Sequence, residues 1–122
     1  MRSIDIHAHL TPQSFWRATQ GGGDWHTLTR EQDARGREVL IAGDRRGQLP
    51  PRSSWTPEQR LADMDSLGVD VHVVSPYAGF YNYELDTAIA TATSAESNDE
   101  ISQMTKTWPD RFAGLATLPM QD

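Results

Sequence analysis

The chain has 122 residues, a formal net charge of −6 and no cysteine. The missing cysteines exclude a disulfide framework and a thiolate metal site, and the acidic balance gives no electrostatic footprint for nucleic acid. Hydrophobic residues make up 37% of the chain, below the usual range of about 45–50%, so part of it is expected to be loop or to need partner surface. No stretch approaches the roughly 18 apolar residues of a membrane span, and the N-terminus lacks the apolar segment of a signal peptide. We therefore expect a cytoplasmic protein that binds neither membrane nor nucleic acid.

The first residues alternate and end in two histidines. They favour an extended strand, in which Ile4 and Ile6 face one way and Asp5 the other. His7 and His9 share a face, with Cβ atoms roughly 7 Å apart by strand rise, so both imidazoles can converge on one cation. The alternative is two ordinary histidines near a strand end. Because the pair directly follows an Ile-Asp-Ile strand, we predict that His7 and His9 are metal ligands.

A long and less regular segment follows, from about residue 10 to residue 54. Residues 12–18 are expected to form one or two helical turns capped by Thr11, and three consecutive glycines then mark a loop. Residues 25–30 and 38–42 flank a turn and predict a β-hairpin, whereas residues 43–54 are expected to be irregular. A loop of that length is uncommon in a compact domain unless it is functional.

The chain becomes regular from residue 55. Thr56 is placed as a helix cap, Gln59 can complete a capping box, and Gly68 is suited to end the helix. The expected elements are a helix over residues 56–68, a strand over 69–74, a helix over about 85–108 and a strand over 112–118. This alternation indicates a parallel sheet or barrel with right-handed crossovers.

These features together resemble the amidohydrolase superfamily, in the amidohydrolase-related branch that includes the aminocarboxymuconate-semialdehyde decarboxylases. That superfamily opens with a strand ending in His-x-His, as at His7 and His9. The other supporting stretches are Trp-Thr-Pro-Glu-Gln-Arg-Leu-Ala-Asp-Met-Asp at 55–65, Gly-Val-Asp-Val running into Val-Ser-Pro at 68–76, and Asn-Asp-Glu at 98–100 followed by residues 109–122. The resemblance covers nearly the whole chain, being specific in residues 55–122 and loose in residues 13–54.

The resemblance implies an α/β fold, namely the N-terminal part of a (β/α)8 TIM barrel of metal-dependent hydrolase type with a β-hairpin insertion after the first strand. It implies one partial barrel domain over residues 1–122, with the site at the C-terminal ends of the strands. One divalent cation, zinc with manganese as the alternative, would be held by His7, His9 and a later histidine and aspartate. The catalytic acid or base is expected beyond Asp122.

An anionic substrate must be held beside such a metal, and three arginines of the irregular segment are candidates. Arg45, Arg46 and Arg52 can each clamp a carboxylate, and the resemblance favours Arg46 as the substrate-binding residue. A solvated basic loop is the alternative for each of them. The expected ligand is a small aromatic or muconate-like carboxylate.

Three aromatic side chains are further candidates for substrate binding. Trp25 and His26 follow the glycines and are placed to act as a lid over the pocket, with hairpin packing as the alternative. Tyr77 follows the end of a strand, where barrel sites are built, although ordinary loop packing is equally compatible with its position.

Two functions remain open at this point. The first is a metal-dependent hydrolase or non-oxidative decarboxylase, and the second is a non-catalytic truncated fragment or partner-dependent subunit with an incomplete metal site. A hydrolase complete in 122 residues would need His26 and His72 as ligands, and no acidic residue is obviously placed beside them. The substrate, the metal identity and a homo-oligomeric state are left open by the sequence alone.

Overall fold

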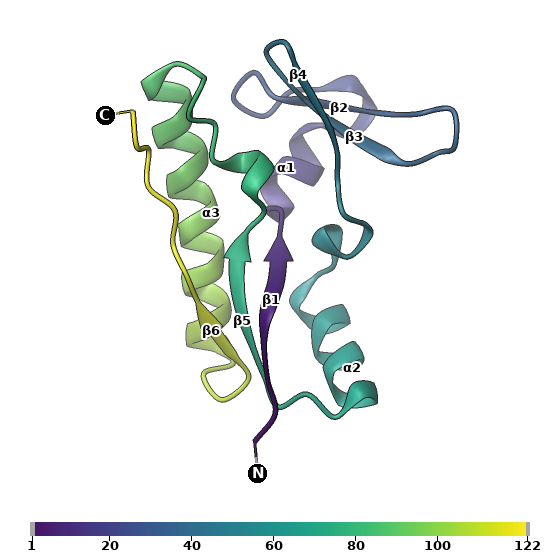
Figure 1. The fold of residues 1–122 in the computed structure, drawn as a ribbon, viewed down its shortest axis with the longest axis vertical. Helices are drawn as coiled ribbons and strands as arrows, with labels where there is room; N and C mark the ends of the chain where they lie inside the picture. The colour runs from purple at the N-terminus through teal and green to yellow at the C-terminus, as the bar shows by residue number, and fades with distance from the viewer. Residues whose placement is uncertain (1, 122) are drawn as a thin grey trace.

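The computed structural model describes residues 2–121, so Met1 and Asp122, the ends of the expected domain, lie outside the described residues. A parallel sheet with strand order β1-β5-β6 forms the centre of the molecule, and a smaller antiparallel sheet with order β2-β3-β4 lies beyond the C-terminal ends of β1 and β5 (Figure 1). The central strands are β1 (Ile4–Leu10), β5 (Val71–Pro76) and β6 (Phe112–Gly114). The expected parallel sheet is therefore confirmed, with a shorter third strand.

Two helices connect the central strands in the order that crossovers require. They are α2 (Pro57–Leu67), before β5, and α3 (Thr87–Thr107), between β5 and β6. The predicted capping box of α2 is present, because Thr56 Oγ1 accepts from Gln59 N–H while Gln59 Oε1 accepts from Thr56 N–H. Gly68 ends this helix in the left-handed conformation, with φ of 71°.

The two helices cover one face of the central sheet and leave the other open. The core on the covered face consists of Ala8, Leu10, Met64, Val74, Ile101, Met104 and Phe112. On the open face Ile4 and Leu115 are each 58% exposed. The covered and open faces therefore differ sharply in burial, although both carry apolar side chains.

The insertion between β1 and α2 contains more regular structure than expected. It comprises α1 (Gln13–Ala18), η1 (Gln20–Gly22), β2 (Thr29–Gln32), β3 (Glu38–Ala42), β4 (Arg45–Gln48) and η2 (Pro51–Ser54). The predicted hairpin is present as β2 and β3, but the prediction that residues 43–54 are irregular was wrong, because β4 pairs with β3. Gly43 and Asp44 join β3 to β4, and Gly43 has the positive φ of 60° that a tight two-residue hairpin connection needs.

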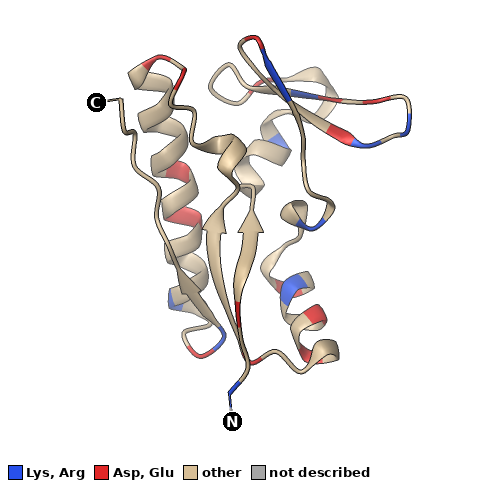
Figure 2. Ribbon diagram, in the orientation of Figure 1, with Lys and Arg blue, Asp and Glu red and all other residues tan. Residues whose placement is uncertain are grey.

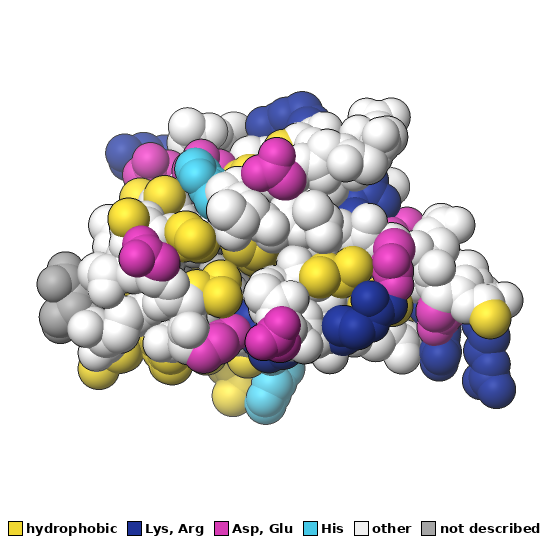
Figure 3. Space-filling view, turned by 90° about the horizontal axis from the view of Figure 1, so that it is seen from above, with side chains coloured by type: hydrophobic (Ala, Val, Ile, Leu, Met, Phe, Trp, Pro, Cys, Tyr) yellow, Lys and Arg dark blue, Asp and Glu magenta, His cyan; other side chains and the backbone are white. Residues whose placement is uncertain are grey.

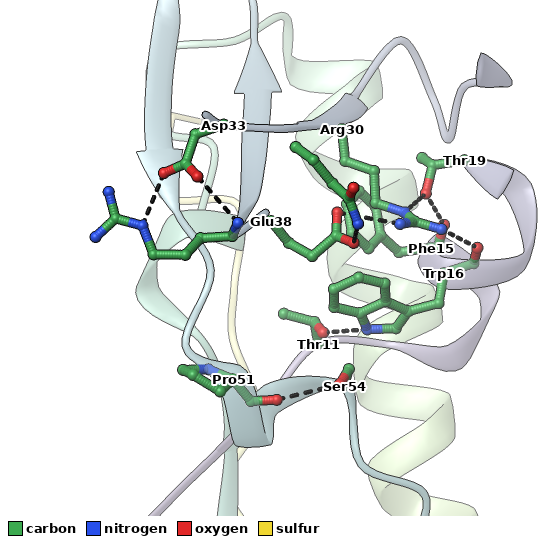
Figure 4. A network of polar contacts seen from close by, with 11 residues as sticks. Thr11, Phe15, Trp16, Thr19, Arg30, Asp33, Glu38, Pro51 and Ser54 are labelled. Atoms are coloured by element: carbon green, nitrogen blue, oxygen red, sulfur yellow. Dashed lines mark hydrogen bonds and ion pairs between the residues drawn. The ribbon is translucent and has the colours of Figure 1, made fainter. Parts of the chain in front are cut away.

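A second hydrophobic core holds this insertion sheet against the rest of the chain. Its buried members are Phe15, Trp25, Leu28, Leu40, Ala42, Leu49 and Phe80, the last of which lies in η3 (Ala78–Phe80) after β5. Arg30 reinforces the contact with α1, because its guanidinium donates to Thr19 Oγ1 at 2.7 Å and lies over the ring of Trp16 (Figure 4). The insertion is thus fixed by packing and does not hang free.

The prediction that Thr11 caps α1 was wrong. Its hydroxyl and its backbone N–H both donate to the carbonyl oxygen of Ser53, at 3.1 and 3.0 Å. The helix begins at Gln13 without a side-chain cap. Thr11 instead joins the end of β1 to η2.

Charged side chains gather on the insertion sheet and on α2 and α3, whereas the central strands carry only Asp5 (Figure 2). Within residues 2–121, no helix combines the length and the apolar composition of a membrane span.

Candidate metal centre

The two histidines lie at the C-terminal end of β1, after an irregularity in the strand. Ile4 pairs with Val71 and Asp5 with His72, but the next pair is Ala8 with Val74, so β1 has one more residue than β5 between the paired positions. This β-bulge reverses the alternation of faces along β1. The expected alternation therefore does not hold across the bulge.

As a result, Asp5 lies on the covered face and His9 on the open face. Asp5 Oδ2 is 3.6 Å from Nε2 of the buried His72, whereas His9 pairs with Ser75 and is exposed. Burial lowers the pKa of His72 below its ordinary value of 6.5, against the opposing attraction of Asp5. His72 is therefore a mostly neutral interior histidine, and its ring packs against Phe112.

The rings of His7 and His9 are close enough to share one cation. Their centroids are 6.0 Å apart with the ring planes at 75° to one another. In a tetrahedral zinc site each imidazole ring centre is roughly 3.2 Å from the ion, so two ring centres lie about 5.2 Å apart. The observed spacing is wider than this, so a shared divalent cation would draw the two rings closer together by about 1 Å.

Ser75, at the end of β5, fixes the orientation of one of these rings. Its hydroxyl oxygen lies 3.2 Å from His9 Nδ1. If His9 held a cation through Nε2, Nδ1 would carry the proton and Ser75 Oγ would accept from it, a second hydrogen bond of the kind that orients metal-binding histidines. Ser75 carries no signal of this role in the sequence, because its contact with His9 joins residues 66 positions apart.

Beside the histidines lies a hollow of about 180 Å³ between β1, η2 and α2, which we call the β1–α2 hollow. Its polar lining includes His7, His9 and Arg52. The guanidinium of Arg52 lies 5.1 Å from the ring centre of Trp55, and the side chain is 67% exposed with only a long 3.5 Å approach to Asp63. The hollow is also lined by the carboxylates of Asp5 and Asp63, so the charge of Arg52 is partly balanced by Asp63.

The substrate-binding residues predicted from the sequence do not line this hollow. Arg46 lies on β4 and forms an ion pair with Glu31 of β2, with more than half of its side chain exposed. Tyr77 lies directly after β5, where its hydroxyl donates to the carbonyl oxygen of Gln48 at 3.3 Å. Substrate binding by these two side chains stays a prediction.

Trp25 and His26 are directed at α3. Both donate to the carboxylate of Glu96, Trp25 from Nε1 at 2.5 Å and His26 from Nε2 at 2.7 Å, and Ser14 adds a third hydrogen bond at 2.9 Å. Burial raises the pKa of Glu96, but these hydrogen bonds outweigh it and leave the pKa below its ordinary value. In this conformation the two aromatic residues hold the insertion to α3, and a lid role remains a prediction.

The described residues bring the two predicted metal ligands, His7 and His9, together. Among residues 2–121, no group of three or more histidine, aspartate or glutamate side chains is arranged to hold a metal ion. His26 and His72 lie in other environments, bound to Glu96 and facing Asp5 respectively.

The comparisons with known proteins agree with this architecture. No family model matches the chain. The 2-amino-3-carboxymuconate-6-semialdehyde decarboxylase of Dictyostelium discoideum is 28% identical over 120 residues, which make up 97% of this chain and 33% of that protein. The crystal structure of 5-carboxyvanillate decarboxylase from Sphingomonas paucimobilis superposes with a TM-score of 0.66 at 30% identity, over 99% of this chain and 36% of that one. The chain is thus similar, over nearly its whole length, to part of these decarboxylases.

The fold is therefore that of the N-terminal part of a TIM barrel, as the sequence predicted. A dihydroxybenzoic acid decarboxylase from Polaromonas sp., solved with manganese and the inhibitor 2-nitroresorcinol, shares this fold with a TM-score of 0.61 at 21% identity, over 100% of this chain and 32% of that one. The chain spans about a third of the length of the relatives that it matches.

Proposed function

We propose that this chain contributes the first two metal ligands, His7 and His9, and a carboxylate-binding arginine to a decarboxylase-type site. The proposed substrate is a small aromatic or muconate-like carboxylate, by analogy with the substrates named for the relatives. The observation that carries the proposal is the His7–His9 ring pair at the strand end, oriented by Ser75. Zinc is the cation that two imidazoles favour, and manganese is the alternative because one structural neighbour holds it.

The chemistry divides between the cation and the residues of this chain. When bound, a divalent cation acts as a Lewis acid on a substrate oxygen and makes a bound water more acidic. His7 and His9 would each offer one ring nitrogen to it, and the Ser75 hydroxyl, 3.2 Å from His9 Nδ1, would help to orient the His9 ring. In a decarboxylation the bond to the carboxylate carbon breaks, CO2 leaves, and the carbon that keeps the electron pair takes up a proton.

Arg52 is the side chain that we propose for the substrate carboxylate in place of Arg46. It shares the β1–α2 hollow with both histidines, its side chain is 67% exposed, and its ion pair with Asp63 is long, at 3.5 Å. Arg46 is already paired with Glu31. A planar guanidinium can bind a carboxylate through two parallel hydrogen bonds, which fixes the orientation of the anion as well as its position.

Metal binding to the purified chain tests the proposal. Isothermal titration with Zn²⁺ and Mn²⁺ is expected to give one site that is lost in the His7→Ala, His9→Ala double variant. The matched control is His26→Ala, which removes a histidine outside the site and is expected to leave the affinity unchanged. Equal binding by the double variant and the unaltered chain contradicts the proposal.

A second function is favoured by one observation. Because residues 2–121 bring together only two potential ligands, a partner-dependent subunit or a non-catalytic fragment is the competing proposal. It predicts metal affinity no tighter than that of an isolated His-x-His peptide, and no decarboxylation of 2,6-dihydroxybenzoate by the chain alone. Stoichiometric metal with turnover rejects this alternative.

A further inference from the structure

One arginine in the first half of α2 is almost completely buried beside the candidate site. Arg60 is 3% exposed, and it lies on the helix whose capping box begins at Thr56. One of its terminal nitrogens, Nη2, donates both to the carbonyl oxygen of His9, at 2.9 Å, and to that of Arg52, at 3.1 Å. These are the backbone carbonyls of the two residues assigned above to the metal and to the substrate carboxylate.

Stability alone gives a poor account of this side chain. Burial lowers the pKa of Arg60, against the attraction of Glu100, and its Nε is buried without a hydrogen-bond partner. A buried charge with an unsatisfied donor is costly, and apolar replacements of such groups are often neutral or stabilising. What Arg60 does supply is geometry, because a single nitrogen joins two chain segments that are far apart in sequence.

Thr11 makes a second tie between these segments, with two hydrogen bonds to the carbonyl of Ser53, which also lines the hollow. The Arg52 carbonyl also accepts from the backbone N–H of Trp55, at 3.2 Å. Arg60 is the side chain that contacts the carbonyls of both His9 and Arg52. Its guanidinium therefore links the backbone of one proposed ligand directly to that of the other.

We propose that Arg60 is a positioning residue that sets the spacing between His9, as metal ligand, and Arg52, as carboxylate ligand. The inference rests on the function proposed above. It predicts that the cation and the carboxylate bind cooperatively, and that this coupling depends on Arg60 while binding of the cation alone does not.

The experiment measures binding of 2,6-dihydroxybenzoate to the full chain with and without Mn²⁺, and of Mn²⁺ alone, by NMR titration. In the unaltered chain Mn²⁺ is expected to tighten dihydroxybenzoate binding by about tenfold, within the usual range of coupling between sites. In Arg60→Met this factor is expected to fall to less than twofold, while the affinity for Mn²⁺ alone changes by less than about threefold. Arg60→Lys keeps the charge without the planar fork and is expected to lie between them.

A matched control is Arg111→Met. Arg111 also donates to two backbone carbonyls, those of Asp70 and Val69, but it does so at the opposite end of the central strands. The Arg111→Met variant is expected to keep the full coupling between Mn²⁺ and dihydroxybenzoate. If Arg60→Met retains the coupling, the role of Arg60 is overturned while the proposed function stands.

Three other outcomes are also decisive. If Mn²⁺ binding survives the loss of His7 and His9, both the proposed function and the positioning role of Arg60 are overturned. If the unaltered chain shows no coupling between Mn²⁺ and dihydroxybenzoate, the positioning role alone is overturned. If Arg60→Met does not give a folded amide spectrum, the coupling in Arg60→Lys decides, and unchanged coupling there overturns the proposal.

Discussion

The covered and open faces of the central sheet carry similar apolar residues in very different surroundings. On the covered face Val74 and Met64 are fully buried between strand and helix, whereas on the open face Ile4 and Leu115 are more than half exposed. Figure 3 shows hydrophobic side chains and a histidine projecting together from one edge of the molecule. Packing within the chain thus accounts for the residues of the covered face, and the candidate ligands lie on the face that the described residues leave uncovered.

The largest expected effect is a difference in the free energy of unfolding between substitutions on the covered and open faces. Met64→Ala removes a fully buried side chain and is expected to cost about 2–5 kcal/mol, whereas Leu115→Ala is expected to change stability by less than about 0.5 kcal/mol. Urea unfolding followed by circular dichroism measures both. A comparable loss in Leu115→Ala would show that the open face is packed in solution, and would break the comparison.

A glycine on the covered face gives the next effect. A Cβ at Gly114 would lie 2.3 Å from Cγ2 of Ile101, so Gly114→Ala is expected to cost about 1–3 kcal/mol by overpacking α3 against β6. The control is Gly47→Ala on β4, where a Cβ meets nothing within 4 Å and a neutral or slightly stabilising effect is expected. Thermal unfolding compares the pair, and equal effects would contradict the close approach of α3 to β6.

On the open face the expected effect is on metal affinity. Ser75→Ala removes the hydrogen bond to His9 Nδ1 and is expected to weaken Zn²⁺ binding by about tenfold, as is usual for partners that orient a metal ligand. Ser54→Ala is the control, because its hydroxyl donates only to the nearby carbonyl of Pro51. Isothermal titration measures both variants, and an unchanged affinity in Ser75→Ala would remove the orienting role.

The smallest effect concerns the pH dependence of stability through His72. Because its folded-state pKa lies below 6.5, the unfolded chain binds more protons just below that pH, so stability falls as the pH drops below 6.5. His72→Gln is expected to remove this part of the slope of unfolding free energy between about pH 5 and pH 7. Urea unfolding across that range tests it, with the NMR midpoint of the His72 ring expected below 6.5. A midpoint at or above 6.5 would contradict burial on the covered face.

Much of the fold was predictable because its signals are local. The capping box of Thr56 and Gln59 involves residues three apart, and the β-branched run of β5 is continuous in sequence. The hairpin insertion and the order of strands and helices were likewise predicted. Thr11 shows the limit, because its hydroxyl binds a carbonyl 42 positions away in place of its own helix.

The candidate site was predictable only in part. The proximity of His7 and His9 follows from their spacing in one strand, but the bulge that separates Asp5 from their face depends on pairing with β5. Arg46 was preferred to Arg52 from the sequence, because the place of Arg52 beside the histidines follows from the path of η2. Arg60 gave no signal, because its partners are carbonyls that any residue type provides.

The pairing of β1 with β5 also has a consequence for the order of folding. His9 and Ser75 are joined across 66 positions of the chain, whereas α3 and the hairpins of the insertion depend on near neighbours in sequence. Local helices and hairpins form within microseconds, and contacts that close long loops are slower because chain entropy must be lost first. The histidine pair is therefore expected to meet its orienting serine after the local helices and hairpins have formed, when Ala8 and Leu10 of β1 pack beside Val74 of β5. The metal-binding geometry would then be among the last features of the native state to appear and among the first to be lost when the central strands separate.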